Sequence, residues 1–195
     1  MKIAQIVCTY PPYYGGMGNV VFQSARELVR RGHVVEVFTP SYYEEKEFRP
    51  EQTPVEATHE PALENQIEQV RRIAPEFRYG NAARMGKIKH DLDAFDLVHL
   101  HYPFFGTAGI VSKWKKNHPS TPLVITYHMD TRAPDWRGLI FKLYAKFWMP
   151  RILHSADALI ASSYDFIAES DAAGLYAAQK TKWLEIPFGV DVDTF

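Results

Sequence analysis

The chain has 195 residues, enough for one domain with a buried core, and 46% of them are hydrophobic, which excludes a disordered polypeptide. It carries 22 Lys and Arg against 23 Asp and Glu, a balance that gives no electrostatic signature of binding to nucleic acid. A single cysteine excludes an internal disulfide and fits a reducing compartment, and no apolar run is long enough to span a bilayer, so we expect a cytoplasmic protein.

The first twenty-one residues combine a strand, a loop rich in proline and glycine, and the start of a helix. Residues 3–8 form a short apolar run typical of a buried strand, in which Cys8 is expected to be an inert thiol. Pro11 and Pro12 exclude a helix directly after this strand, and helical periodicity begins near Asn19. Free amides at such a helix start, with the helix dipole behind them, suit a phosphate or carboxylate. The glycines of this loop are Gly15, Gly16 and Gly18.

Apolar runs and helical periodicity then alternate along the chain. The first helix should end at Gly32, a residue favoured at helix C-termini, and a second strand follows at 34–38, which makes a parallel strand–helix–strand unit. After a long loop at 41–64, further strands are expected at 66–73, 95–101, 122–127, 158–161 and 183–186. Further helices are expected at 81–92, 106–117, 138–154 and 163–173, the last capped by Ser162 or Ser163. The alternation predicts a doubly wound, mostly parallel α/β sheet with helices on both faces.

Polar and aromatic side chains gather where the predicted strands end. In doubly wound sheets, ligands bind beyond the carboxyl ends of the strands, so these side chains are expected to share one edge of the sheet and to mark a site. They are residues 10–18, His101 and Tyr102, His128 to Asp130, and Ser162 and Ser163.

The glycine loop does not match the two common nucleotide-binding motifs. The third glycine of the dinucleotide fingerprint is missing, and the acidic residue about twenty positions on, Glu36, lies within a strand rather than at its end. No Lys-Ser or Lys-Thr pair follows the glycines, which excludes a nucleoside-triphosphate loop. Two alternatives stay open, an anion-binding loop and a flexible turn without a ligand.

The histidines allow two chemical interpretations. His99 and His101 point the same way along one strand, and His128 and Asp130 follow another, so these four side chains could supply ligands for a metal-dependent hydrolase. In the other interpretation His99 is a core histidine and His128 hydrogen-bonds a substrate hydroxyl or phosphate, or stabilises charge that develops in a transition state.

The predicted helix at 138–154 is rich in aromatic residues, and Lys142 and Lys146 fall one turn apart on one side of it. A core helix with one solvated side is the favoured interpretation. The alternative is a helix that lies on a membrane surface, which leaves peripheral membrane contact open.

Six short motifs occur in order along nearly the whole chain. They are Pro11-Pro12 with Gly15-Gly16, L-x-x-x-G-H-x-V at 28–35, D-h-V-H-x-H at 96–101, T-x-H at 126–128, A-D-x-h-h-x-x-S at 156–163, and the segment 186–191. Together they resemble the amino-terminal domain of family 4 retaining glycosyltransferases, which have the GT-B fold of two Rossmann-like domains. Phe188 departs from the family pattern, in which asparagine is frequent at this position.

The resemblance implies an enzyme of carbohydrate biosynthesis, of the hexosyltransferase type. Such an enzyme moves a sugar from a nucleotide-sugar donor to a carbohydrate or lipid-linked acceptor with retention of configuration, and it needs no metal, no cofactor and no nucleic acid. Carried onto this chain, the catalytic residue would be His128, beside the donor sugar. The donor diphosphate would lie at Gly15, Gly16 and Gly18. The acceptor contacts, assigned from position alone, would be Tyr13, Tyr14, His101, Tyr102 and Asp130.

The chain stops at Phe195, just after the last motif. The resemblance therefore implies that residues 1–195 form a single acceptor-side domain, that the carboxy-terminal donor-binding domain is absent, and that the isolated half turns over poorly or not at all. A metal-dependent hydrolase and a non-catalytic sugar- or phosphate-binding subunit stay as alternative functions.

Overall fold

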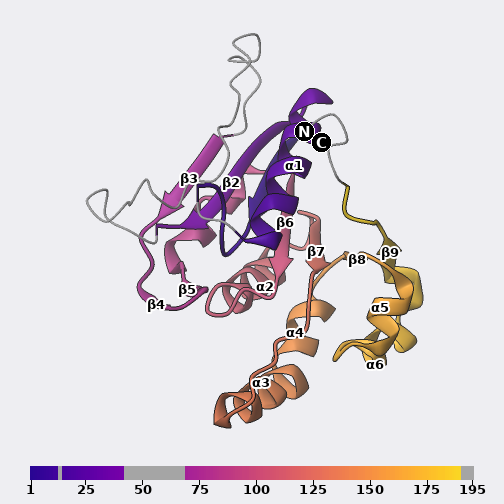
Figure 1. The fold of residues 1–195 in the computed structure, drawn as a ribbon. Coiled ribbons are helices and arrows are strands. Elements are labelled where there is room, and N and C mark those ends of the chain that lie inside the picture. The colour runs from indigo at the N-terminus through magenta and orange to yellow at the C-terminus, as the bar shows by residue number, and fades with distance from the viewer. Residues whose placement is uncertain (13–14, 42–68, 190–195) are drawn as a thin grey trace, which may run out of the picture.

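A computed structural model describes residues 1–12, 15–41 and 69–189, and these form an α/β domain built on one seven-stranded sheet (Figure 1). All six strand pairings in this sheet are parallel, so the doubly wound, Rossmann-like fold is confirmed. The strands, in their order across the sheet, are β3 (Gln69–Ile73), β2 (Val34–Pro40), β1 (Lys2–Ile6), β6 (Leu97–Tyr102), β7 (Leu123–Tyr127), β8 (Ala158–Ala161) and β9 (Trp183–Glu185).

The strand order reverses between β1 and β6. From β1 the chain moves outward to β2 and β3, whereas from β6 it moves the other way through β7 and β8 to β9. Because parallel crossovers are right-handed, the helices of the two halves lie on opposite faces of the sheet. One face carries α1 (Gly16–Arg30), and the other carries α2 (Ala108–Asn117), α3 (Trp136–Phe147), α4 (Met149–His154), α5 (Tyr164–Glu169) and α6 (Ala173–Ala178). The reversal point is where ligands bind in this class of fold.

The two faces of the β6–β8 half are covered unequally. Side chains such as Val98, Leu100 and Ile125, which face α2 and α4, are 0% exposed, while alternate residues on the α1 side are half-buried. A groove of about 730 Å³ runs along this less covered face, between α1 and residues 186–189. Its floor includes Ile3, Gln5, Leu97, His99, Val124, Thr126 and Ile160.

Helix α1 ends as its sequence predicts. Gly32 has a φ of +85°, a conformation that glycine adopts without steric cost. The Gly32 amide donates to the Val29 carbonyl at 2.9 Å and the His33 amide to the Leu28 carbonyl at 3.1 Å, the two bonds of a Schellman cap. The helix starts at Gly16 rather than near Asn19, because the Asn19 amide already donates to the Gly15 carbonyl at 3.0 Å.

The helix expected at 81–92 is wrong. The structure has a hairpin of β4 (Phe77–Tyr79) and β5 (Ala82–Arg84), followed by two 3₁₀ turns, η4 (Gly86–His90) and η5 (Leu92–Ala94). Gly80, with a φ of +54°, supplies the turn, and the amide of the fully buried Ala83 donates to the Phe105 carbonyl at 3.0 Å. This long-range pairing overrides the local helical pattern.

Two other helices differ from the expected ones. The helix predicted at 138–154 is broken at Trp148 into α3 and α4, because Pro150 in the first turn of α4 has no amide hydrogen to continue the preceding helix. The helix predicted at 163–173 is α5 alone, and α6 and the 3₁₀ turn η6 (Lys180–Lys182) were not expected. Ser163 does cap α5, its Oγ accepting from the Phe166 amide at 3.1 Å.

The long loop at 41–64, apart from Ser41, and residues 66–68 of the predicted edge strand lie outside the described residues. Within the described ranges, no helix has the length and hydropathy needed to cross a membrane.

Candidate functional site

The loop between β1 and α1 packs its glycines against Thr9. A Cβ atom on Gly18 would lie 2.7 Å from the Thr9 carbonyl oxygen, and one on Gly15 would lie 2.9 Å from Thr9 Oγ1. A Cβ atom on Gly16 would meet nothing within 4 Å. Gly15 and Gly18 therefore let α1 approach the end of β1, while Gly16 faces open space.

The first turn of α1 has the amides expected of an anion site. Gly15 is the N-cap and has no side chain that could cap the helix. Because the Asn19 amide makes the first intrahelical bond, the amides of Gly16, Met17 and Gly18 have no acceptor within the helix. A helix of 15 residues adds its dipole to these donors.

Arg72, a residue that the sequence analysis did not single out, is bound to this loop. It lies in β3, and its guanidinium donates to the Pro11 carbonyl. The loop is thereby tied to the sheet.

Alanine at Gly18 should reduce the free energy of unfolding by about 1–3 kcal/mol, because the added methyl group would collide with the Thr9 backbone, which cannot move aside. Alanine at Gly16 is the matched control and should leave stability unchanged or raise it by up to about 1 kcal/mol. Urea unfolding of both variants measures the difference. Equal stabilities would contradict the close packing described for Gly18.

Three side chains, from β1, from β6 and from the residue directly after β7, form a continuous hydrogen-bonded chain. Gln5 of β1 bonds His101 of β6, with 2.6 Å between Gln5 Oε1 and His101 Nε2. His101 in turn bonds His128, with 2.8 Å between His101 Nδ1 and His128 Nε2. The backbone of His128 is held as well, since its amide donates to the Tyr102 carbonyl at 2.9 Å. The structure thus brings His128 and the glycine loop to the same carboxyl edge of the sheet.

The orientation of the Gln5 amide sets the direction of this chain. Gln5 Oε1 accepts only, so neutral His101 donates from Nε2 and accepts at Nδ1 from the Nε2–H of His128. His128 Nδ1 then carries a lone pair and has no partner among the described residues, so it can accept a hydrogen bond from a hydroxyl group. Gln5 Nε2 is buried without a partner among the described residues. A half-turn of the amide would exchange Oε1 and Nε2 and reverse the donor and acceptor roles in both hydrogen bonds.

Burial keeps the three histidines of this region neutral. It lowers the pKa of His99 to about 3, with a smaller contribution from charge on His128, and it lowers the pKa of His128 to about 4. The pKa of His101 is also well below its ordinary value, through burial first and then through its two histidine neighbours. His99 makes its own bond, 2.8 Å from Nε2 to Thr126 Oγ1. At neutral pH His128 therefore acts as a hydrogen-bonding imidazole and not as a cation.

Phe188 covers one side of the His128 ring. The two rings are stacked with centroids 5.0 Å apart and planes 21° apart. The segment that carries Phe188 continues β9 along the sheet, since the Ile186 amide donates to the Ala161 carbonyl at 2.9 Å. His128 is thus held by a hydrogen bond on its edge and by an aromatic ring on its face.

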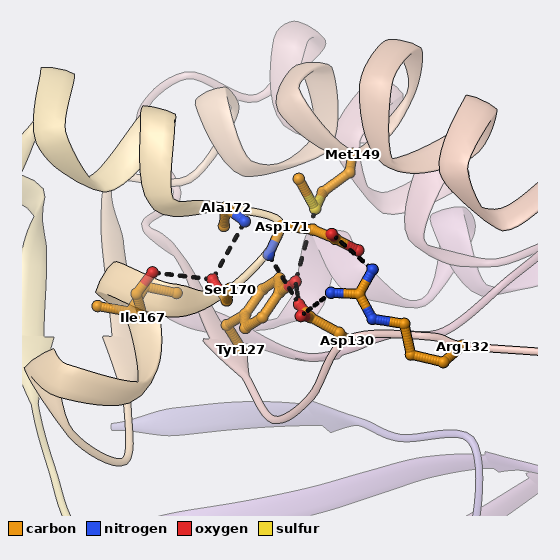
Figure 2. Close-up of polar contacts among 8 residues, drawn as sticks. All are labelled: Tyr127, Asp130, Arg132, Met149, Ile167, Ser170, Asp171 and Ala172. Carbon is orange, nitrogen blue, oxygen red and sulfur yellow. Dashed lines mark hydrogen bonds and ion pairs between the residues drawn. The ribbon is translucent and has the colours of Figure 1, made fainter.

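Asp130 is engaged within the protein (Figure 2). Its Oδ1 accepts from the Tyr127 hydroxyl at 2.5 Å and from the Asp171 amide at 3.0 Å. Arg132 bridges the carboxylates of Asp130, at 2.8 Å, and Asp171, at 2.9 Å. Burial, together with this bond to Asp130, raises the pKa of the Tyr127 hydroxyl. The cluster fastens the loop after β7 to the turn between α5 and α6.

The other predicted acceptor residues are placed as follows. His101 is 2% exposed with both ring nitrogens bonded, so it reaches a ligand only through His128. Tyr102 is 4% exposed and stacks on Tyr127 at 5.4 Å. Tyr13 and Tyr14 lie outside the described residues.

The four residues considered for a metal site use polar atoms in bonds within the protein. His99 bonds Thr126, His101 lies between Gln5 and His128, and Asp130 is held by Tyr127 and Arg132. No group of three His, Cys, Asp or Glu side chains in the described ranges is arranged to hold a metal ion. Cys8, 5% exposed, is buried as predicted, and burial raises its thiol pKa.

The parallel sheet and its reversal between β1 and β6 define a Rossmann-like domain. The family model for Glycosyltransferase Family 4 matches residues 14–194, so the chain belongs to that family.

Two curated relatives give the family a more specific context. The chain is 28% identical over 193 residues to the O-antigen chain mannosyltransferase C of Escherichia coli. This match covers 98% of this chain and 46% of the relative. It is 28% identical to a D-inositol 3-phosphate glycosyltransferase of Actinosynnema mirum, covering 93% of this chain and 44% of the relative. The chain therefore spans about half the length of the curated relatives it matches.

Solved structures agree on the fold. The catalytic domain of starch synthase IV from Arabidopsis thaliana, bound to ADP and acarbose, has a TM-score of 0.62 at 15% identity, covering 99% of this chain and 52% of that one. The HepE protein of Anabaena, in complex with UDP-glucose, has a TM-score of 0.55 at 15% identity, covering 99% of this chain and 45% of that one. At such identities the likeness shows the fold alone, that of one half of a GT-B glycosyltransferase.

Proposed function

We propose that this chain is the amino-terminal, acceptor-side half of a cytoplasmic hexosyltransferase that moves a sugar from a nucleotide-sugar to a carbohydrate or lipid-linked acceptor with retention of configuration. Membership of glycosyltransferase family 4 supports sugar transfer. The single structural observation that carries the proposal is the Gln5–His101–His128 chain, which ends at the same sheet edge as the open amides of α1.

The geometry supports distinct roles on the donor side. Transfer breaks the bond between the anomeric carbon and the diphosphate, so negative charge develops on the diphosphate oxygen. Amides fixed at the start of α1, at Gly16 and Gly18, would stabilise that charge without reorganising. His128 Nδ1 would accept a hydrogen bond from a hydroxyl of the donor sugar or of the acceptor, which orients the sugar for attack.

On the acceptor side, the contacts assigned to Tyr13, Tyr14 and Tyr102 stay predictions. We assign His101 and Asp130 to positioning instead of direct contact, because their polar atoms are used within the protein. His101 would hold the His128 ring, and Asp130 would hold the loop that carries His128.

Activity of the complete protein tests the proposal. The product of the whole reading frame, incubated with labelled UDP-glucose or GDP-mannose and lipid-linked or oligosaccharide acceptors, should form a glycoside whose anomeric configuration, read by NMR, matches that of the donor. The 195-residue chain alone should show no measurable turnover. An inverted product would exclude the retaining mechanism, and donor binding without transfer by the complete protein would favour a non-catalytic subunit.

A further inference from the structure

Helix α3 turns an apolar stripe outward. None of its 12 residues is buried. Residues at positions i, i+3, i+4, i+7 and i+11 of a helix share one side, and here all five are large and apolar. Their exposed fractions are 72% for Trp136, 63% for Leu139, 50% for Ile140, 44% for Leu143 and 45% for Phe147. The favoured interpretation of this segment as a core helix is therefore wrong for α3, and only α4, with Met149, Ile152 and Leu153 buried, belongs to the core.

The opposite side of α3 is fixed to the domain, so the apolar stripe is held in place. Phe141 and Tyr144 contact Phe105, with ring centroids 5.4 Å and 4.7 Å apart. At the amino end, the Asp135 side chain accepts from the Arg137 amide at 3.0 Å and caps the helix. These contacts hold α3 in the orientation that leaves the stripe exposed.

Basic residues accompany the stripe. Between Trp136 and His154 there are four Lys and Arg residues and no Asp or Glu, in a chain whose net charge is −1. Arg137 is paired with Asp135 at 2.6 Å, whereas Lys142, Lys146 and Arg151 make no ion pair with a described residue. Lys142 and Lys146 lie one helical turn apart along one flank of the stripe, so positive charge runs parallel to exposed apolar surface.

We propose that α3 docks on the surface of an anionic lipid bilayer, with the apolar stripe inserted among the acyl chains and Lys142 and Lys146 directed to lipid phosphates. A protein partner fits less well, because lysine is depleted at protein–protein interfaces, while long lysine side chains beside an apolar stripe reach bilayer headgroups. Trp136 and Trp148, 72% and 53% exposed, stand at the two ends of α3, and tryptophan is enriched at bilayer interfaces.

This inference goes beyond the proposed function and does not depend on its donor chemistry. Figure 1 shows α3 at the end of the molecule away from the amino terminus, following β7 in the chain. Because His128 leaves the carboxyl end of β7, docking through α3 would bring the candidate site to the membrane side of the domain.

Vesicle flotation of the 195-residue chain tests the proposal. The chain should float with phosphatidylcholine vesicles that contain 30% phosphatidylglycerol and much less with phosphatidylcholine alone, as roughly a fivefold partition factor is expected for each lysine at an anionic surface. The double variant Lys142→Glu/Lys146→Glu and the double variant Leu139→Ser/Leu143→Ser should each lower partition by at least about tenfold. All four side chains are exposed, so both variants should keep the wild-type circular dichroism spectrum and melting temperature.

Two controls and one spectroscopic readout make the result specific. Lys113→Glu on α2 and Leu184→Ser on β9 change exposed residues of the same types elsewhere and should leave partition unchanged. Tryptophan emission should shift to shorter wavelength on vesicle binding, and the shift should be lost in the double variant Trp136→Phe/Trp148→Phe. Wild-type partition in both double variants, equal binding to neutral and anionic vesicles, or a dimer that Leu139→Ser/Leu143→Ser dissociates would each overturn the proposal.

Discussion

Replacing His128 with alanine should lower the rate of sugar transfer by the complete protein by about a hundredfold or more, the effect expected when one fixed polar group is removed from a reacting centre. The ring is held in one orientation by His101 at 2.8 Å and by stacking on Phe188 at 5.0 Å. Alanine removes the free Nδ1 and leaves His101 without its partner. The measurement is kcat and KM of wild type and variant with the same donor and acceptor, beside a melting curve that reports folding.

A second histidine serves as the matched control. His154 on α4 is exposed and bonds the Pro150 carbonyl at 2.7 Å, so His154→Ala should leave both kinetic parameters unchanged. Gln5→Leu keeps His128 but removes the group that sets the direction of the chain, and it should lower kcat more than it raises KM. Near wild-type transfer by a folded His128→Ala variant would remove this residue from the mechanism.

The sheet could be predicted because each of its main strands is an apolar run with a turn signal at its end. The hairpin at β4 and β5 could not, since Ala82 to Arg84 have little strand propensity of their own. They form a strand by pairing with Phe77 to Tyr79 across the turn at Gly80 and through the bond to the Phe105 carbonyl. Helical periodicity likewise predicted a helix at 138–154 with Lys142 and Lys146 on one side, but it did not single out the apolar stripe of α3. It could not say that the stripe faces solvent, because periodicity fixes which residues share a side and not what covers that side.

The candidate site was predictable in its composition more than in its connections. His128 stands out at the end of a strand, whereas Gln5 belongs to no motif and becomes significant only through the register that sets β1 beside β6. A signal did exist, because a glutamine inside a buried apolar strand needs a polar partner. Asp130 was placed correctly after β7. Its side-chain contacts depend on the turn between α5 and α6, and α6 itself was not expected.

The free energy of unfolding should fall steeply as pH decreases from about 6 to about 4. Burial lowers the pKa of His99, His101 and His128, so the folded chain keeps all three neutral where the unfolded chain, with ordinary values near 6.5, binds protons. The stability that these residues contribute is therefore complete above the unfolded pKa and is lost as pH falls toward the folded values of about 4 and about 3. Each histidine adds about 1.4 kcal/mol per pH unit, so the three together give a slope of up to about 4 kcal/mol per unit.

Urea unfolding at half-unit steps between pH 7 and pH 4 measures this slope. His99→Gln removes one of the three groups and should reduce the slope by about a third, while His154→Gln changes an exposed histidine and should leave it as in the wild type. A slope equivalent to less than one proton, or a slope that His99→Gln does not alter, would contradict the conclusion that these three histidines are buried in their neutral form. The His128 ring should also stay neutral during catalysis, because its pKa is about 4. Protonation of this ring should therefore not reduce the rate of sugar transfer until the pH is low enough to unfold the domain.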